Sequence, residues 1–175
     1  MNDSKYGYDA KENVLRLSLL RSPAWPDPHA DEGHHEFTYS IYPHSGNWRE
    51  AETVRAGYNL NYKLEAVQVL NHDGSLPPEH SFLGLSSQSV VLTAAKGSAD
   101  ENENNDFLVL RFYEWAGKDS DVTLQLPAGV QSAWETNLIE QPIGKLALSK
   151  GTLTVHCKPF EIKTVKVKIS TNSRN

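Results

Sequence analysis

The stretch Ile162-Lys163-Thr164-Val165-Lys166-Val167-Lys168-Ile169 carries the clearest structural signal in this 175-residue chain. In its second half, apolar residues at positions 165, 167 and 169 alternate with lysines at 166 and 168. Because successive side chains of a β-strand point to opposite faces of a sheet, the alternation predicts a strand with one face toward a core. We expect the three lysines to form the solvated face of an antiparallel sheet, where they also discourage edge-to-edge aggregation.

The same period of two recurs along the chain and predicts an all-β fold. Leucines at 15, 17 and 19 alternate with polar residues, and Phe37, Tyr39 and Ile41 begin a second alternating run that ends at Tyr42. Further strands are expected at residues 64–70, 88–95, 107–115, 121–126, 131–136 and 160–169. Short strands joined by turns, such as 127–129 and 149–151, are typical of an antiparallel β-sandwich.

One segment has a helical pattern instead. From Trp48 to Asn59, apolar residues recur at spacings of three, three and four. Asn47 is a suitable N-cap, and Glu50 stands where a capping box places its glutamate. The sequence therefore predicts one short helix over residues 48–59.

The segment 71–78, Asn-His-Asp-Gly-Ser-Leu-Pro-Pro, is the strongest break in the chain. We place a subdivision there, with residues 1–76 holding the helix and the longer loops, and residues 77–175 holding the terminal β-sandwich strands. The acidic stretch 99–106 is interpreted as a solubilising hairpin loop. It lacks the ordered spacing and central glycine of a calcium-binding loop.

Composition excludes several classes of protein. A formal net charge of −5 argues against a nucleic-acid-binding protein, because no basic stripe is available to neutralise phosphates. The single cysteine, Cys157, cannot form an internal disulfide and fits a reducing compartment. No apolar run approaches the ~20 residues that a membrane span needs. The first residues lack the apolar core of a signal peptide, so we expect a cytoplasmic protein.

Two polar loops are candidates for a functional site. Asn2–Asp9 precedes a strand, and Arg21–Glu36 contains three prolines that stiffen it. The second loop allows three interpretations: a polar wall of a sugar site with Trp25 as an apolar platform, a structural loop, or a metal site. The metal site would use His29, His34 and His35 with Asp31 or Glu36. Neighbouring residues of a strand point to opposite faces, which weighs against His34 and His35 sharing one metal.

Motifs for self-contained catalysis are absent from the sequence. We find no serine-nucleophile elbow, no glycine-rich phosphate loop and no His-Glu-x-x-His. Glu114 lies in an alternating strand beside aromatic residues, and we interpret it as a structural carboxylate. No catalytic residue and no metal ligand is therefore assigned in this chain.

Several segments together resemble the C-terminal region of family 38 α-mannosidases, most closely the cytosolic and bacterial branch. They occur in the family's order and at similar spacing, and they extend over nearly the whole chain. One departure is His34, where the family pattern has arginine. The segments are Asn-Asp-Ser-Lys-Tyr-Gly at 2–7, Leu-Ser-Leu-Leu-Arg-Ser-Pro at 17–23, Gly-His-His-Glu-Phe-Thr-Tyr at 33–39, Pro-His at 43–44, Tyr-Asn-Leu-Asn at 58–61 and Leu-Val-Leu-Arg-Phe-Tyr-Glu at 108–114.

The resemblance implies a fold and a function. The fold is part of a galactose-mutarotase-like supersandwich followed by a terminal sandwich. The function is that of the non-catalytic C-terminal portion of a retaining α-mannosidase, whose catalytic carboxylates and zinc lie in an N-terminal domain. The implied partners are that domain and a mannoside, with no nucleic acid, no membrane and no cofactor in this portion. We expect the isolated chain to be inactive and to self-associate. By position, the residues implied at the rim of the substrate pocket are Asp3, Lys5, Asp31, His35 and Glu36.

Two alternatives stay open on the sequence. The first is a stand-alone carbohydrate-binding β-sandwich, with Trp25, Trp48 or Tyr42 as the stacking platform for a sugar. The second is a purely structural domain that contacts no ligand. The first predicts measurable sugar affinity in the isolated chain. The second predicts that changes at Lys5 or His35 alter stability but not turnover.

Overall fold

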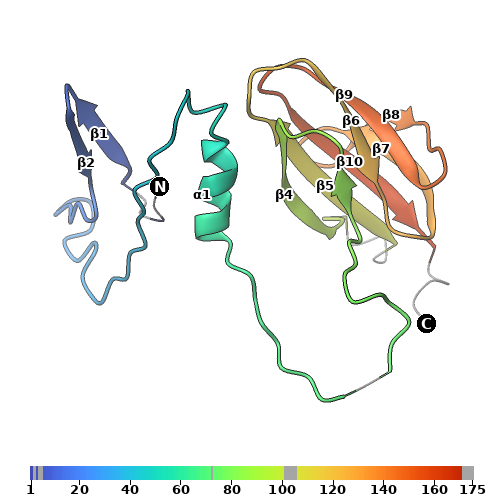
Figure 1. The fold of residues 1–175 in the computed structure, drawn as a ribbon, viewed down its shortest axis with the longest axis horizontal. Helices are drawn as coiled ribbons and strands as arrows, with labels where there is room; N and C mark the ends of the chain where they lie inside the picture. The colour runs from blue at the N-terminus through green and yellow to red at the C-terminus, as the bar shows by residue number, and fades with distance from the viewer. Residues whose placement is uncertain (2, 4–5, 72, 101–105, 171–175) are drawn as a thin grey trace. The chain divides into compact units, whose positions relative to one another are not determined.

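The computed structural model describes residues 1, 3, 6–71, 73–100 and 106–170. The chain divides into two compact units, Met1–Leu70 and Asn71–Asn175, called here the N-terminal unit and the C-terminal unit (Figure 1). The subdivision expected after residue 76, as a boundary between domains, stays a prediction. Within the described residues, no helix is both long enough and apolar enough to cross a membrane.

The C-terminal unit is an antiparallel β-sandwich, as the alternation predicts. One sheet has the strand order β4-β5-β10-β7-β8 and the other has the order β3-β6-β9. The turns at Gly129 and Gly151 have positive φ, a conformation that glycine adopts without strain. The strands are β3 Gly84–Leu85, β4 Val90–Gly97, β5 Phe107–Glu114, β6 Ser120–Gln125, β7 Val130–Thr136, β8 Pro142–Leu146, β9 Thr152–Cys157 and β10 Ile162–Ile169.

The core of the sandwich draws one face from each sheet. Strands β5 and β10 supply alternate residues from the larger sheet, and β6 and β9 supply them from the smaller sheet. Each such side chain removes apolar surface from water, which favours folding by roughly 25 cal/mol per Å². The core side chains include Val90, Leu110, Phe112, Val122, Leu124, Leu153, Val155, Cys157, Val165 and Val167.

The prediction that the lysines of β10 form one solvated face is wrong. Strand β10 is paired with β5 on one side and with β7 on the other, so side chains of both neighbouring strands flank its outward-pointing residues. Lys166 lies between Val109 and Trp134 in register and is only 4% exposed. Lys163 shares the side of Val165, where its ammonium contacts Glu135 Oε1 at 2.7 Å and Glu161 Oε1 at 3.1 Å. A central strand thus buries lysine stems that an edge strand would leave in water.

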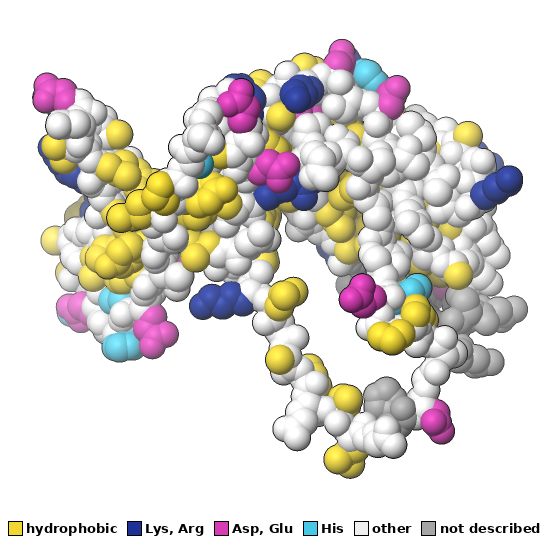
Figure 2. All heavy atoms as spheres, viewed as in Figure 1, with side chains coloured by type: hydrophobic (Ala, Val, Ile, Leu, Met, Phe, Trp, Pro, Cys, Tyr) yellow, Lys and Arg dark blue, Asp and Glu magenta, His cyan; other side chains and the backbone are white. Residues whose placement is uncertain are grey.

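The N-terminal unit has a different organisation. Strands β1 (Tyr8–Lys11) and β2 (Val14–Leu17) form an antiparallel hairpin, and α1 (Thr53–Asn61) is the one helix of the described chain. Between these elements the backbone runs in loops and turns. In the described part of this unit no side chain is fully buried. Figure 2 shows hydrophobic side chains on its visible surface, where a folded domain more often places polar ones.

The helix begins later than the capping pattern predicts. Asn47 Oδ1 accepts the backbone N–H of Arg49 at 2.9 Å, and Glu50 Oε2 accepts that of Asn47 at 2.9 Å, so the predicted capping box is present. It caps a single turn, because Glu52 then has φ of 48° and interrupts the helical path. The continuous helix starts at the next residue and runs two residues past the predicted end.

Several predicted strands are wrong. The alternating run 14–20 forms a strand only at Val14–Leu17, and residues 37–42 and 64–70 form no regular strand, although Tyr39 forms a single bridge. Around it, Asp3 N–H donates to Thr38 O at 3.1 Å, and Ser40 N–H donates to Met1 O at 2.9 Å. A strand needs a hydrogen-bonded neighbour along its length, and among the described residues of the N-terminal unit only the hairpin of β1 and β2 has such regular pairing.

Candidate functional site

The proline-rich loop is held by the carboxylate and the carbonyl of Asp31. The Tyr6 hydroxyl and the Ser22 backbone N–H both donate to Asp31 Oδ2, the latter at 3.0 Å. On the other side, His35 Nε2 hydrogen-bonds the Asp31 backbone carbonyl at 2.8 Å. Asp31 has φ of 63°, a left-handed conformation that aspartate tolerates better than most residues. These contacts fix the loop between residues 22 and 35 against Tyr6, close to the start of the chain.

His35 and Glu36, two of the predicted rim residues, diverge. The His35 ring is half-buried and stacks on Phe37 with ring centroids 5.9 Å apart. Glu36 has a side chain that is 91% exposed and contacts His34 Nε2 at 3.6 Å. Of the predicted residues of this loop, Asp31 and His35 therefore come together, and Glu36 does not join them.

Asp3 is held against the segment that follows His35. Its Oδ1 accepts the Thr38 backbone N–H at 2.8 Å, and its own N–H donates to the Thr38 carbonyl at 3.1 Å. The hydrogen bond from the Thr38 amide holds the pKa of Asp3 below its ordinary value. Lys5, the remaining predicted rim residue, lies outside the described residues.

The metal interpretation of the histidines does not match the geometry. His29 Nδ1 contacts Glu32 Oε1 at 3.0 Å, whereas His34 contacts Glu36 and His35 contacts a backbone carbonyl. The three histidines thus have separate partners. Within residues 6–71, 73–100 and 106–170, no group of three or more histidine, cysteine, aspartate or glutamate side chains is placed to hold a metal ion.

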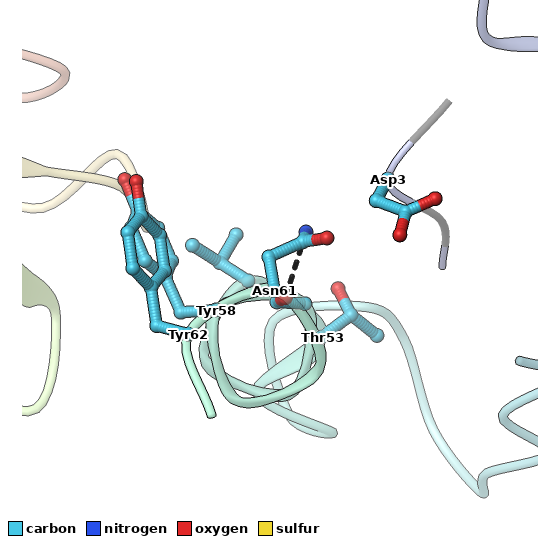
Figure 3. Close-up of a pocket in the computed structure, with 7 residues that line it drawn as sticks. Asp3, Thr53, Tyr58, Asn61 and Tyr62 are labelled. Atoms are coloured by element: carbon cyan, nitrogen blue, oxygen red, sulfur yellow. Dashed lines mark hydrogen bonds between the residues drawn. The ribbon is translucent and has the colours of Figure 1, made fainter. Parts of the chain in front are cut away.

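An open groove follows helix α1, with Asp3 on its far side (Figure 3). Figure 3 shows Tyr58 and Tyr62 side by side on one side of the helix and Asp3 on the other, with Thr53 and Asn61 between them. The volume of this groove, called the α1 groove below, is about 680 Å³. Asp3, Asn61 and Tyr62 also line a neighbouring groove of about 460 Å³ that extends to Lys63 and Glu65. The α1 groove is lined by Asp3, Thr53, Val54, Gly57, Tyr58, Asn61 and Tyr62.

Most of the groove residues were not predicted as site candidates from the sequence. Thr53, Tyr58, Asn61 and Tyr62 are brought to Asp3 by the helix, and their spacing alone does not reveal that contact. The available signal was the pair Tyr58 and Tyr62, which are four residues apart and therefore neighbours on a helical face. The predicted helix ended at Asn59, so Tyr62 was not placed on it.

Glu114 is a structural carboxylate, as interpreted from the sequence. It is completely buried and accepts backbone N–H groups of Ala116 at 2.9 Å, Gly117 at 2.7 Å and Phe160 at 3.1 Å. Burial alone raises the pKa of Glu114, but the amides of Phe160, Ala116, Gly117 and Lys118 outweigh it and hold the pKa below its ordinary value. A carboxylate that closes two loops in this way serves the fold.

Comparison with known proteins places these features in a family. The model of the glycosyl hydrolases family 38 C-terminal domain matches residues 1–29, and the model of the family 38 C-terminal beta sandwich domain matches residues 89–165. The two matches fall in the N-terminal unit and the C-terminal unit respectively. Together they span more than half of the chain.

Three curated proteins that match this chain are named alpha-mannosidases. Alpha-mannosidase 2C1 of Mus musculus is 40% identical over 168 residues, which cover 94% of this chain and 16% of the relative. Alpha-mannosidase 2C1 of Homo sapiens is 39% identical over 166 residues, 93% of this chain and 16% of the relative. Alpha-mannosidase G of Dictyostelium discoideum is 32% identical over 170 residues, 95% of this chain and 15% of the relative.

The chain therefore spans only about a sixth of the length of these relatives. The similarity extends across both units, and each unit contains a match to a C-terminal domain of the family's proteins. On these matches the chain belongs to glycosyl hydrolase family 38 and contains its C-terminal domains.

Proposed function

We propose that this chain is the non-catalytic C-terminal portion of a retaining α-mannosidase that hydrolyses terminal α-linked mannose. The observation that carries the proposal is the similarity to α-mannosidases over 94% of the chain, together with the matches to both C-terminal family models. The reacting groups are then supplied by the part of the enzyme that precedes these residues. A retaining glycosidase needs two carboxyl groups roughly 5–5.5 Å apart.

The arrangement of the carboxylates supports a role without direct chemistry. Glu114, the most deeply buried of the described carboxylates, is occupied by backbone amides. Asp31 is occupied by Tyr6 and the Ser22 amide, and Asp3 by the Thr38 amide. Carboxylates engaged in this way hold loops in place, and the lowered pKa values of Asp3 and Glu114 do not suit them to protonate a leaving group.

The same contacts support a role at the rim of the substrate pocket. Asp31, which closes the proline-rich loop, precedes His35 in the sequence. Thr38, whose N–H donates to Asp3, follows it. Together they hold the candidate rim residues Asp3, Asp31 and His35 in one arrangement before substrate arrives. Preorganised groups of this kind lower the entropic cost of positioning a substrate, so a domain without reactive groups still affects rate.

The exposed apolar surface of the N-terminal unit supports a partner. Ile41 is 87% exposed, and Leu15, Tyr39 and Leu64 are also well exposed. Exposed apolar groups in such number are typical of an interaction surface. We assign the partner as the N-terminal catalytic domain of the same enzyme, which also holds the zinc. We further propose a cytoplasmic location, like that implied by the resemblance to the cytosolic branch.

The test is hydrolysis of an aryl α-mannoside, with zinc or cobalt added, by this chain alone and by the full-length polypeptide that carries it. We expect turnover only by the full-length polypeptide. Within it, Asp31→Asn is expected to lower kcat/KM about tenfold, because a neutral amide oxygen accepts the Tyr6 and Ser22 hydrogen bonds only about half as strongly as the carboxylate oxygen Oδ2 does. The matched control is Glu36→Gln, which changes an exposed side chain. Turnover by this chain alone would refute the proposal.

A second candidate function is a stand-alone carbohydrate-binding module. The observation that favours it is Trp25, whose side chain is 85% exposed within the stiff proline-rich loop. An exposed indole offers a flat apolar face to a sugar ring. This function predicts millimolar or tighter affinity of the isolated chain for mannosides, lost in Trp25→Ala. Titration calorimetry with methyl α-mannoside distinguishes the two functions.

A further inference from the structure

The α1 groove is lined by uncharged polar and aromatic side chains together with one carboxylate. Tyr58 and Tyr62 contribute aromatic faces and phenol groups, Thr53 contributes a hydroxyl, and Asn61 contributes an amide. The described lining residues include one carboxylate, Asp3, and no lysine or arginine. Among these described residues, a phosphate or another anion would find no cation. A ligand with hydroxyl groups and an apolar ring face would find partners for both.

The aromatic wall of the groove consists of two stacked rings and is open to solvent. The rings of Tyr58 and Tyr62 stack with centroids 5.6 Å apart and an interplanar angle of 15°. Tyr62 nevertheless remains 73% exposed. Stacking restricts the ring orientations, so less side-chain freedom is lost when a ligand packs against the rings. In Figure 3 the two rings stand beside the space that Asn61 and Thr53 also border.

The floor of the groove contains a glycine that the chain itself does not require. Gly57 lies at the middle of the nine-residue helix α1, where glycine weakens a helix relative to alanine. Its φ is not positive, so its conformation does not require glycine. A Cβ placed there meets no described atom within 4 Å, so packing does not require glycine either. A glycine in such a place suits the close approach of another molecule to the helix backbone.

We propose that the α1 groove is a saccharide subsite, which holds the sugar units that follow the terminal mannose of an oligosaccharide substrate. The inference rests on the proposed function, because the mannose that is cleaved then lies with the catalytic groups elsewhere in the enzyme. Units on the leaving-group side extend past the rim toward Asp3 and α1. The volume of about 680 Å³ falls in the range of roughly 300–1,000 Å³ that is typical of small-molecule sites.

The test compares two substrates in the full-length polypeptide that carries this sequence. One is an aryl α-mannoside, which has no further sugar unit, and the other is a linear α-linked mannotriose. Gly57→Phe places a ring over the groove floor without removing any lining side chain. We expect it to lower kcat/KM for mannotriose at least tenfold relative to kcat/KM for the aryl mannoside. Gly74→Phe is the matched control, because Gly74 does not line the α1 groove and a Cβ there also meets no described atom within 4 Å, so the variant should keep the ratio within twofold.

A second pair of variants tests the aromatic wall. Tyr62→Ala is expected to lower the same ratio about fivefold, mainly through KM. Tyr39→Ala removes another exposed tyrosine, one that does not line the α1 groove, and should keep the ratio within twofold.

The outcomes separate the inference from the proposed function. An unchanged ratio in both Gly57→Phe and Tyr62→Ala overturns the subsite. Equal losses on the two substrates, together with a lower Tm, also overturn it, because the groove is then filled by other parts of the polypeptide. An unsubstituted full-length polypeptide that hydrolyses neither substrate would overturn the proposed function, and the subsite with it.

Discussion

Alternating apolar and polar residues have different outcomes in the two units. In the C-terminal unit, alternating segments such as β5 and β10 pair into two sheets and bury one face completely. In the N-terminal unit, alternating segments such as 37–42 and 64–70 remain without a regular sheet, and their apolar side chains stay exposed. The alternation states which face of a strand is apolar. Only a second layer of structure turns that face into a core.

This difference teaches what each unit depends on. The C-terminal unit contains both layers of its sandwich within residues 84–169. The N-terminal unit contains a two-stranded hairpin and a nine-residue helix, and neither is normally stable alone in water. We infer that the rest of the N-terminal unit's core comes from other parts of the proposed enzyme.

The largest expected effect contrasts one aromatic residue in the core with one exposed aliphatic residue. Phe112→Ala removes a completely buried ring from β5 and should cost about 3–5 kcal/mol of unfolding free energy. Ile41→Ala, at an 87% exposed position, should change it by less than ~0.5 kcal/mol. Urea unfolding of the chain, followed by the fluorescence of its tryptophans, measures both. Comparable losses would show that the N-terminal unit has a core of its own.

The buried carboxylate Glu114 should give the next largest effect. Glu114→Gln leaves backbone N–H groups of two loops without a full set of acceptors, at a cost of about 2–3 kcal/mol. The exposed Glu36→Gln serves as the control and should be nearly neutral. A neutral result at Glu114 would contradict the assignment of these hydrogen bonds.

The same residue predicts how stability depends on pH. The pKa of Glu114 is lower in the folded state than its ordinary value of 4.5, which approximates the unfolded state. Its contribution is therefore complete above that value and is lost as pH falls from 4.5 through the folded pKa. Unfolding free energies at pH 7 and pH 3.5 should differ less in Glu114→Gln than in the unsubstituted chain. An equal difference in both would rule out Glu114 as a source of the acid sensitivity.

Self-association of the isolated chain tests the exposed face of the N-terminal unit. We expect concentration-dependent dimers or larger species in sedimentation velocity, because the apolar surface that the enzyme would cover is free to pair with another copy. Ile41→Lys should weaken the association by about tenfold, which corresponds to roughly 1.4 kcal/mol. A chain that stays monomeric at high concentration would count against the missing partner.

The smallest expected effect concerns α1. Gly57→Ala should stabilise the N-terminal unit by about 0.5–1 kcal/mol, because alanine is the better helix former and its methyl group has room. Amide hydrogen exchange within Thr53–Asn61 reports the change locally. Faster exchange in the variant would mean that the methyl group meets an obstacle after all.

The sequence predicted the fold class well, and most of the strands of the C-terminal unit. Val165 and Val167 are buried as their alternation indicates, and Phe112 shares the buried face with Glu114. Strands β8 and β9 were not predicted. The alternation of Leu153, Val155 and Cys157 in β9 is clear, whereas Pro142 and Gly144 hide the pattern of β8. The lysines of β10 misled because alternation does not show whether a strand is central or at an edge.

The candidate site was less predictable, for physical reasons. A loop has no period, so the contacts of Asp31 with Tyr6 and Ser22 depend on chain geometry that no spacing reveals. Alternation of neighbouring side chains weighed against a shared metal at His34 and His35, which do have separate partners, whereas His35 and Glu36 were predicted to lie together and do not. The capping box at Asn47 is present, yet the left-handed Glu52 separates it from helix α1. The helix therefore begins and ends later than predicted, and the groove residues on it were not anticipated.

The central claim is that these residues complete an α-mannosidase whose reacting groups lie in the preceding part of the polypeptide. The most direct test expresses that preceding part and this chain separately and measures aryl α-mannoside hydrolysis for each and for the mixture. We predict no turnover by this chain, little by the preceding part, and recovery on mixing. Turnover by this chain alone, or full activity of the preceding part without it, would contradict the claim.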